Sequence, residues 1–227
     1  MTFSRPNRLG ATLMGAILAA SSFTAVGAQS SPSPGPGAKS RSELAAIAKA
    51  RADSARYPYT DADIQFMSGM IAHHAQAIVM AGWAASHGAD PSVRTLCDRI
   101  INAQRDEIAT MQTWLRDRRL PVPEASPRGM KMTVNGVEHE MLMPGMLTEA
   151  QLRQLDQARG TDFDRLFLGF MIQHHQGAVA MVKDLFDSTG AGQDETVFKF
   201  ASDVNVDQST EIERMQQMLA ALISSPQ

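Results

Sequence analysis

An internal repeat constrains this chain more than any other feature. MIAHHAQAIVM occupies Met70–Met80 and MIQHHQGAVAM occupies Met171–Met181, so both copies read Met-Ile-x-His-His with another Met six residues later. A second pair, QRDEIATMQ and QSTEIERMQ, occupies Gln104–Gln112 and Gln208–Gln216. Each copy is long enough for a helix, a turn and a helix. Two such units, which bury their apolar faces against each other, predict two stacked helical hairpins.

The spacing of apolar residues and breakers is helical nearly throughout. Helices are expected at about 43–56, 60–86, 91–119, 148–159, 161–187 and 194–222. Thr60, Thr148 with Gln151, and Thr161 with Asp164 are the expected helix starts. Asn135-Gly136 between two valines predicts a β-hairpin turn. The sequence thus predicts an all-α, ferritin-like four-helix bundle with repeats at about 60–119 and 161–222, joined by a Met-rich connector at 120–147.

The first 28 residues predict a secretory signal peptide. Arg5 and Arg8 precede a short apolar run, and Val26-Gly27-Ala28 forms a small-residue cleavage pattern. The run is too short for a confident membrane span. Residues 29–40 are rich in Pro, Ser and Gly and predict a disordered linker, which leaves 41–227 as one helical domain. The expected location is periplasmic or secreted, with no membrane attachment after cleavage.

Composition argues against nucleic acid and membrane partners and raises the question of what the many methionines do. Without Arg5 and Arg8 the chain carries 19 basic and 24 acidic residues, a net charge of −5, which does not favour nucleic acid or a membrane surface. Cys97 is the sole cysteine and has no disulfide partner in the chain. Of 15 methionines, 13 remain without Met1 and Met14. Met fills irregular cores, but its thioether also suits Cu(I). Composition alone favours the first explanation, that Met packs the core.

Helical geometry sets the repeated polar residues among apolar ones. At about 100° per residue, His73 falls on the inward stripe of its helix, with His74 at the stripe's edge. The residues that share the expected inward stripes are Phe66, Met70, His73, Ala77 and Met80; Phe167, Met171, His174, Ala178 and Met181; Cys97, Gln104, Glu107, Met111 and Trp114; and Gln208, Glu211 and Met215.

Two explanations of these buried polar groups stay open. In the structural one, His73 bonds Glu107 and His174 bonds Glu211, while Met fills gaps. In the functional one, the same groups bind metal. Two His-His pairs, each flanked by Met, favour metal. His87 and Cys97 are expected to be structural or incidental.

The metal is argued from the donor types. Catalytic zinc needs three His or carboxylate ligands, and di-iron bundles need Glu-x-x-His, which these stripes lack. Thioether with imidazole indicates copper, as Cu(I) or through the imidazoles as Cu(II), with silver as a mimic. Imidazole binds metal only when neutral, so copper held by His is expected to weaken as the pH falls through about 6.5.

The connector carries a second group of soft donors. Its Pro and Gly residues exclude a regular helix, so we expect an accessory Cu(I)-acquiring arm outside the core of the fold. A hydrophobic lid over the end of the bundle is the alternative. The candidate ligands in the connector are Met130, Met132, His139, Met141, Met143 and Met146.

The Met-x-x-His-His helices, the Glu-Ile-x-x-Met helices and MPGM at Met143–Met146 resemble the CopM-like family of exported domains, catalogued as a domain of unknown function, DUF305. The resemblance spans about residues 60–222. It implies a ferritin-like four-helix fold, copper binding through Met and His, and no established enzymatic activity. The ligands that it implies in this chain are Met70, His73, His74, Met80, Met111, Met171, His174, His175, Met181 and Met215.

The sequence therefore predicts a non-enzymatic periplasmic protein that sequesters copper or passes it to a copper-transfer protein. One alternative is a ferritin-like oxidoreductase with Glu107 and Glu211 as additional ligands, which requires Glu and His side chains to converge. Another is a metal-free helical interaction module, which requires a protein hydrogen-bond partner for every inward His.

Overall fold

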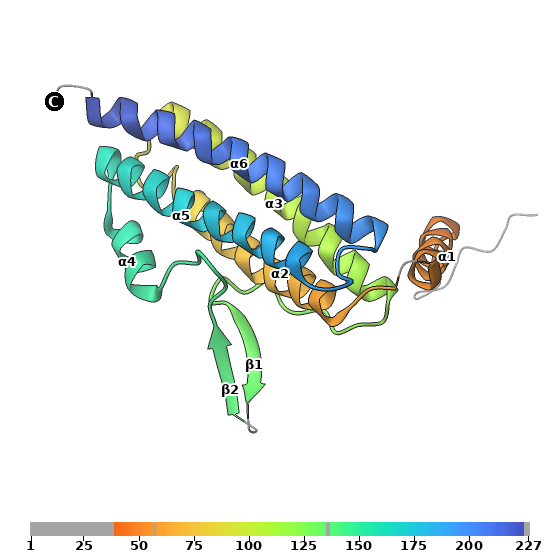
Figure 1. Cartoon of the computed structure of the whole chain (residues 1–227). Coiled ribbons are helices and arrows are strands. Elements are labelled where there is room, and N and C mark those ends of the chain that lie inside the picture. Colours follow the sequence, from red (N-terminus) through yellow and green to blue (C-terminus); the bar gives the residue numbers. More distant parts are fainter. Residues whose placement is uncertain (1–38, 57, 135–136, 225–227) are drawn as a thin grey trace, which may run out of the picture. The chain divides into compact units, whose positions relative to one another are not determined.

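The computed structural model describes residues 39–56, 58–134 and 137–224, and the predicted signal peptide lies outside them. The elements are α1 (Arg41–Arg56), α2 (Asp61–Gly82), α3 (Pro91–Asp117), β1 (Met130–Val134), β2 (Val137–Met141), α4 (Glu149–Gln157), α5 (Gly160–Asp187) and α6 (Glu195–Ser224). Helix α2 packs on α3, α5 packs on α6, and α2 lies beside α5 (Figure 1). The predicted four-helix bundle of two hairpins is confirmed. Within the described ranges, no helix combines the length and apolar character that a membrane crossing needs.

Two of the three expected helix starts are confirmed. The Thr60 and Thr148 side chains each accept from the backbone N–H three residues on, in reciprocal capping boxes with Asp63 and Gln151. The third expectation is wrong. Helix α5 begins at Gly160, and its N-cap residue, Arg159, makes no side-chain capping bond.

The repeated aspartates tie the two hairpins together. Asp63 Oδ1 accepts from the Gly192 N–H at 2.7 Å, in the loop between α5 and α6. Both carboxylate oxygens of Asp164 accept from the Asp90 N–H at 3.2 Å, in the loop between α2 and α3. Both aspartates are buried. Each copy of the repeat therefore satisfies a backbone donor in the turn of the other copy, where the unpaired group would cost free energy.

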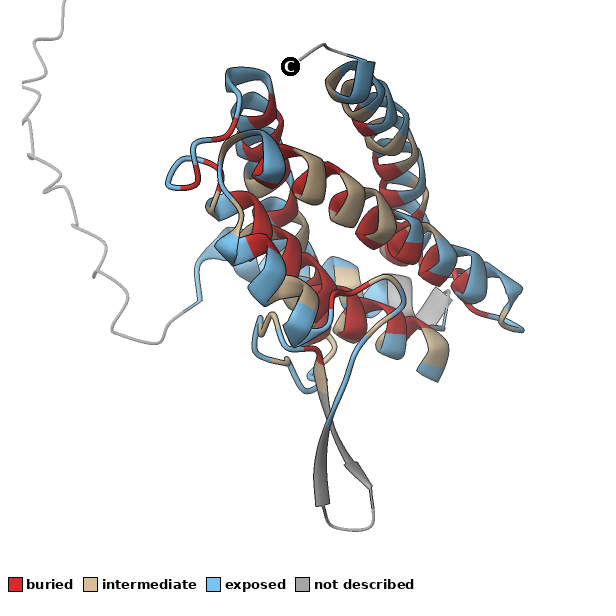
Figure 2. Cartoon of the chain, turned by 90° about the vertical axis from the view of Figure 1, so that its left-hand side faces the viewer, coloured by how far each residue is buried: buried red, intermediate tan, exposed pale blue. Residues whose placement is uncertain are grey.

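The apolar core consists of two clusters. Buried residues occupy the facing sides of the helices (Figure 2). One cluster contains Met70, Met111 and Met181, and the other contains Met171, Met215 and Met80. Under the repeat these two sets are equivalent, and each takes its third Met from the opposite hairpin. This exchange fits α2 and α5 crossing as antiparallel helices about a pseudo-twofold axis.

The connector is fixed to both repeats, through Gln76 of α2 and Gly177 of α5. Gln76 Nε2 donates to the carbonyls of Pro127 and Leu147, both at 3.0 Å, and its Oε1 accepts from the Leu147 N–H at 2.6 Å. At the equivalent position of α5, Gly177 lets the connector approach so closely that a Cβ there would lie 2.0 Å from the Pro144 oxygen. Gly145 beside it has φ 78°, a conformation that favours glycine.

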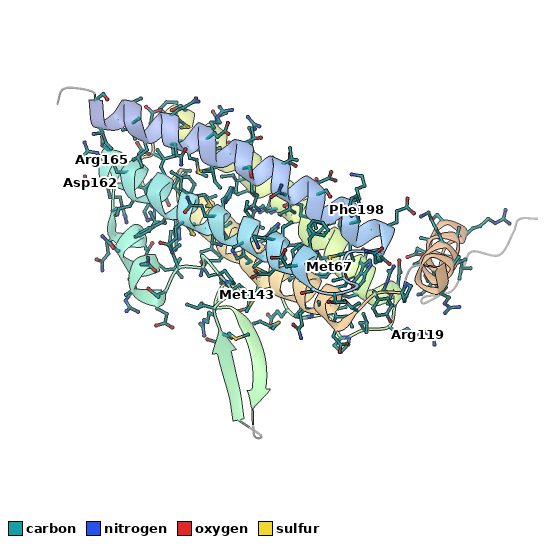
Figure 3. The ribbon with its side chains drawn as sticks, viewed as in Figure 1. Met67, Arg119, Met143, Asp162, Arg165 and Phe198 are labelled. Atoms are coloured by element: carbon teal, nitrogen blue, oxygen red, sulfur yellow. The ribbon has the colours of Figure 1, made fainter. Side chains whose placement is uncertain are left out.

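This attachment corrects the expectation for the connector. Met146 is buried, and Met143 packs against the first core cluster at the point where the connector meets the bundle (Figure 3). The prediction of an arm outside the core is therefore wrong for these two residues. Strands β1 and β2 do pair as an antiparallel hairpin, while the predicted turn residues, 135–136, lie outside the described residues.

Candidate metal centre

Four histidines form a layer between the two core clusters. His73 and His74 come from α2, His174 and His175 come from α5, and all four are fully buried. The rings of His73 and His174 have centroids 3.8 Å apart. Within each helix the neighbouring rings are 6.2 and 6.3 Å apart. His74, expected at the edge of the inward stripe, is thus as deeply placed as His73.

The ring nitrogens Nε2 of three histidines face acceptors. His73 Nε2 lies 3.0 Å from the Pro144 carbonyl oxygen. His175 Nε2 lies 2.7 Å from Glu211 Oε2. His74 Nε2 lies 2.8 Å from Glu107 Oε2, although out of line for a full hydrogen bond. In a neutral imidazole one nitrogen donates and the other accepts, so these acceptors favour a proton on Nε2 and leave the Nδ1 lone pair free.

The predicted histidine–glutamate pairs are therefore displaced by one residue. The partner of Glu107 is His74, where we expected His73, and the partner of Glu211 is His175, where we expected His174. One residue corresponds to about 100° of helical rotation. That rotation directs the second His of each pair toward the other helix of its own hairpin and leaves the first His to meet its counterpart across the axis.

Several ring nitrogens in this layer have no partner. Within the described residues, Nδ1 of all four histidines and also Nε2 of His74 and His174 are buried without a hydrogen bond. An unsatisfied buried polar group costs about 1–3 kcal/mol. The layer therefore carries a stability cost that hydrocarbon side chains would avoid. Imidazole lone pairs are also the groups that a metal ion would use.

Burial keeps the central pair neutral. Desolvation, helped by the neighbouring charge of His74, lowers the pKa of His73 to about 3. Desolvation also holds the pKa of His174 well below its ordinary value, with smaller effects from the charges of His73 and His175. A pH threshold near 6.5 therefore does not apply to these two residues, because they keep their lone pairs well below it.

The nitrogen and carboxylate donors do not form a complete metal-binding cluster. Across the part of the chain that the structure describes, no group of three or more His, Cys, Asp or Glu side chains could hold an ion. The His–Glu contacts are pairs. A metal in this layer would therefore need methionine sulfur, or a rotation of the rings, to complete its coordination. The convergence required by a His/Glu oxidoreductase centre is not found in those residues.

The remaining candidates divide between core and hairpin. The core candidates are all buried: Met70, Met80, Met111, Met171, Met181 and Met215. In the hairpin, Met130 pairs with Met141 and Met132 pairs with His139. Since strand positions alternate between faces, these four positions share one face. Met141 is 44% exposed.

His87 and Cys97 are both buried outside the histidine layer. The ring nitrogens of His87 contact the Ser86 hydroxyl at 2.9 Å and the Asp156 carbonyl oxygen at 2.9 Å, which ties the turn after α2 to α4. Cys97 is buried, and desolvation raises the pKa of its thiol to about 12. A protonated buried thiol is a poor metal ligand.

Three contributors to the layer were not identified from the sequence. They are the Pro144 carbonyl, Gln76 and Gly177. A backbone carbonyl has no residue-type signature. Gln76 and Gly177, by contrast, occupy equivalent positions of two otherwise matching segments, and their difference was a readable signal that the connector contacts the two helices differently.

Comparison with known proteins agrees with this architecture. The family model described as "Domain of unknown function (DUF305)" matches residues 63–219. A crystal structure of a DUF305 fragment from Deinococcus radiodurans is 29% identical, with a TM-score of 0.59, covering 72% of this chain and 99% of that one. CopM in its Cu(I)-bound form is 30% identical, with a TM-score of 0.53, covering 70% and 96%. CopM has also been crystallised in Cu(II)-bound and Ag-bound forms.

Another relative matches this chain over a much shorter stretch. Uncharacterized protein L153 of Acanthamoeba polyphaga mimivirus is 40% identical over 58 residues, and the match spans 38% of its length and 26% of this chain. The match to the family model, in contrast, includes α3, α5, most of α2 and α6, and both His-His pairs. On that evidence the chain belongs to the DUF305 family.

Proposed function

We propose that this protein binds copper in the buried histidine layer, with methionine sulfur from the flanking clusters as additional ligands. The observation that carries the proposal is the set of buried imidazoles with free Nδ1 atoms, two of which donate from Nε2 to a carbonyl or carboxylate. Metal-binding histidines characteristically use the other ring N–H in this way, which fixes the tautomer and orients the ring.

The donor set selects among metals. Thioether sulfur is a soft ligand that favours Cu(I), while imidazole accepts copper in both oxidation states. The structural similarity to CopM, crystallised with Cu(I), Cu(II) and silver, supports the same choice. A metal-free interaction module is not favoured, because His174 has no hydrogen-bond partner for either ring nitrogen within the described residues. Sequestration or transfer of copper in the periplasm is the role that we propose.

Replacement of His174 separates this function from a structural role. His174→Leu exchanges an unsatisfied imidazole for an apolar side chain of similar size. The metal-free variant is expected to be more stable than the parent by about 1 kcal/mol, while its Cu(I) affinity falls. Chemical unfolding and competition titration against a chromophoric Cu(I) chelator measure the two quantities.

His87→Gln is the matched control, because His87 is also buried but both of its ring nitrogens have partners. This control should lose stability and keep its Cu(I) affinity. If His174→Leu lost stability and bound Cu(I) as tightly as the parent, the layer would be structural only.

The hairpin is proposed as an accessory site that acquires Cu(I). Its four soft-donor positions share one face, and Met141 is exposed. We expect the triple variant Met130→Leu, Met132→Leu, Met141→Leu to keep the metal-free stability, because Met and Leu have similar volumes. Its Cu(I) capacity should fall, as measured by copper content after desalting.

The matched comparison is Met143→Leu with Met146→Leu, in the attached end of the connector. Both residues contact the core, so stability should change by less than about 1.5 kcal/mol. An unchanged capacity in the triple variant would show that the hairpin takes no part in copper acquisition.

A further inference from the structure

A cavity of about 250 Å³ lies between α3 and α6, beyond the histidine layer. Its lining includes the Gln-x-x-Glu segment of each repeat. The residues that bear on its chemistry are Gln104, Glu107, Asp207, Gln208, Thr210 and Glu211. Arg99 also lines the cavity, so three carboxylates face one guanidinium. The lining is therefore rich in oxygen donors and carries a net negative charge.

The two glutamines supply independent evidence for a ligand. Gln104 and Gln208 are each only 3% exposed. Oε1 of Gln104 and both side-chain polar atoms of Gln208 have no hydrogen-bond partner within the described residues. Burial of an amide without partners costs about 1–3 kcal/mol. The same unsatisfied residue type in both repeats points to a polar occupant of the cavity.

The carboxylates of the cavity are close enough to repel one another. Desolvation raises the pKa of Asp207, and the negative charges of Glu107, Asp203 and Glu211 raise it further, against a smaller lowering by Lys199. A positive ion between these groups would relieve the repulsion. Carboxylate and amide oxygens are the ligands that hard divalent cations prefer.

We propose that this cavity binds a hydrated divalent cation, at a site distinct from the copper layer. Six water molecules at about 30 Å³ each occupy about 180 Å³, so the cavity has room for an ion that keeps its hydration shell. Contact through water agrees with the absence, among the described residues, of three acidic or His side chains placed to hold an ion directly. The glutamine amides would then bond the ion's water molecules.

The site touches the histidine layer at two points. Glu107 and Glu211 line the cavity and also contact His74 and His175 through Oε2. Substitution of either glutamate would disturb both sites. Asp207 and Gln208 line the cavity, and in the described part of the chain neither side chain forms a hydrogen bond or ion pair with a histidine. They are therefore the positions that test the cavity alone. The proposal does not depend on copper binding.

Mn²⁺ titration of the metal-free full chain, with free Mn²⁺ measured by electron paramagnetic resonance, tests the site. One ion per chain is expected to bind. Asp207→Asn removes one of three negative charges and should weaken binding by about tenfold, equivalent to about 1.4 kcal/mol. Glu213→Gln removes an exposed charge of α6 outside this cavity and should bind like the parent. Cu(I) affinity should be unchanged in Asp207→Asn, so failure of the copper proposal would be seen separately.

Gln208→Leu provides a second, independent test. It removes an unsatisfied buried amide, so the thermal midpoint of the metal-free protein should rise, while Mn²⁺ affinity falls. Absence of saturable Mn²⁺ binding to the parent overturns the proposal. So does an affinity that stays at the parent's value in either Asp207→Asn or Gln208→Leu.

Discussion

The metal-free protein is expected to lose stability steeply as the pH falls below about 6.5. In the unfolded chain a histidine takes up a proton near that pH, whereas burial holds the folded-state pKa of His73 at about 3. Between those two values only the unfolded state binds the proton, so acid favours unfolding. By pH 4 His73 alone would contribute about 3 kcal/mol of the loss, at about 1.4 kcal/mol per pH unit.

His174 acts in the same direction, because burial also lowers its pKa. The pKa of Asp164 is raised by desolvation and opposes a part of the loss. Urea unfolding at pH 7, 6, 5 and 4 measures the effect, and His174→Leu should show a shallower dependence than the parent. A free energy of unfolding that stays constant from pH 6.5 to 4 would mean that the buried rings take up protons without unfolding.

Gly177→Ala is expected to destabilise the protein by about 2–4 kcal/mol through a backbone clash. The added Cβ would lie 2.0 Å from the Pro144 oxygen and 2.6 Å from Gly145 Cα. Pro144 and Gly145 would have to move away from α5. The His73 Nε2 contact with the Pro144 oxygen would be lost, together with the bond from Gln173 Nε2 to the Gly145 oxygen at 3.2 Å. The free-energy cost of this overpacking exceeds the stabilisation from the higher helix propensity of Ala.

Gly169→Ala is the matched control in the same helix. Apart from the adjacent residues and the nearby backbone of α5 itself, no atom of the described residues lies within 4 Å of a Cβ at Gly169. This substitution should therefore raise stability by up to about 1 kcal/mol. Thermal unfolding of both variants provides the comparison. Equal stability of Gly177→Ala and Gly169→Ala would show that the connector does not pack on α5 in solution.

The fold was largely predictable because its signals are local or repeated. Thr60 and Thr148 begin their helices through side chains three residues from their partners. The start of α5 was not predictable from the same rule, since Asp164 bonds a turn 74 residues away instead of the local backbone. A contact between residues so far apart in the sequence cannot be predicted from the residues that surround either of them.

The candidate site was predictable in residue type and less so in geometry. The repeat identified all four histidines and both glutamates, but their pairing was wrong by one residue. Helical periodicity predicts which face of a helix is buried, but it does not decide which of two adjacent histidines faces a given neighbour. Adjacent side chains differ in direction by about 100°. The meeting of His73 and His174 depends on how the two hairpins cross, and the role of Pro144 depends on the path of the connector.

X-ray absorption at the copper K-edge tests the central claim most directly. The measurement compares two Cu(I)-loaded proteins. Both carry Leu at Met130, Met132 and Met141, so that the hairpin does not contribute. One keeps all four histidines, and the other, the double variant, also carries His73→Leu and His174→Leu. The protein with all four histidines is expected to show imidazole nitrogen together with thioether sulfur around copper. The double variant, which keeps only His74 and His175, is expected to show fewer imidazole nitrogens and to lose most of its copper. Identical spectra and copper content in the two proteins would contradict copper binding in the histidine layer.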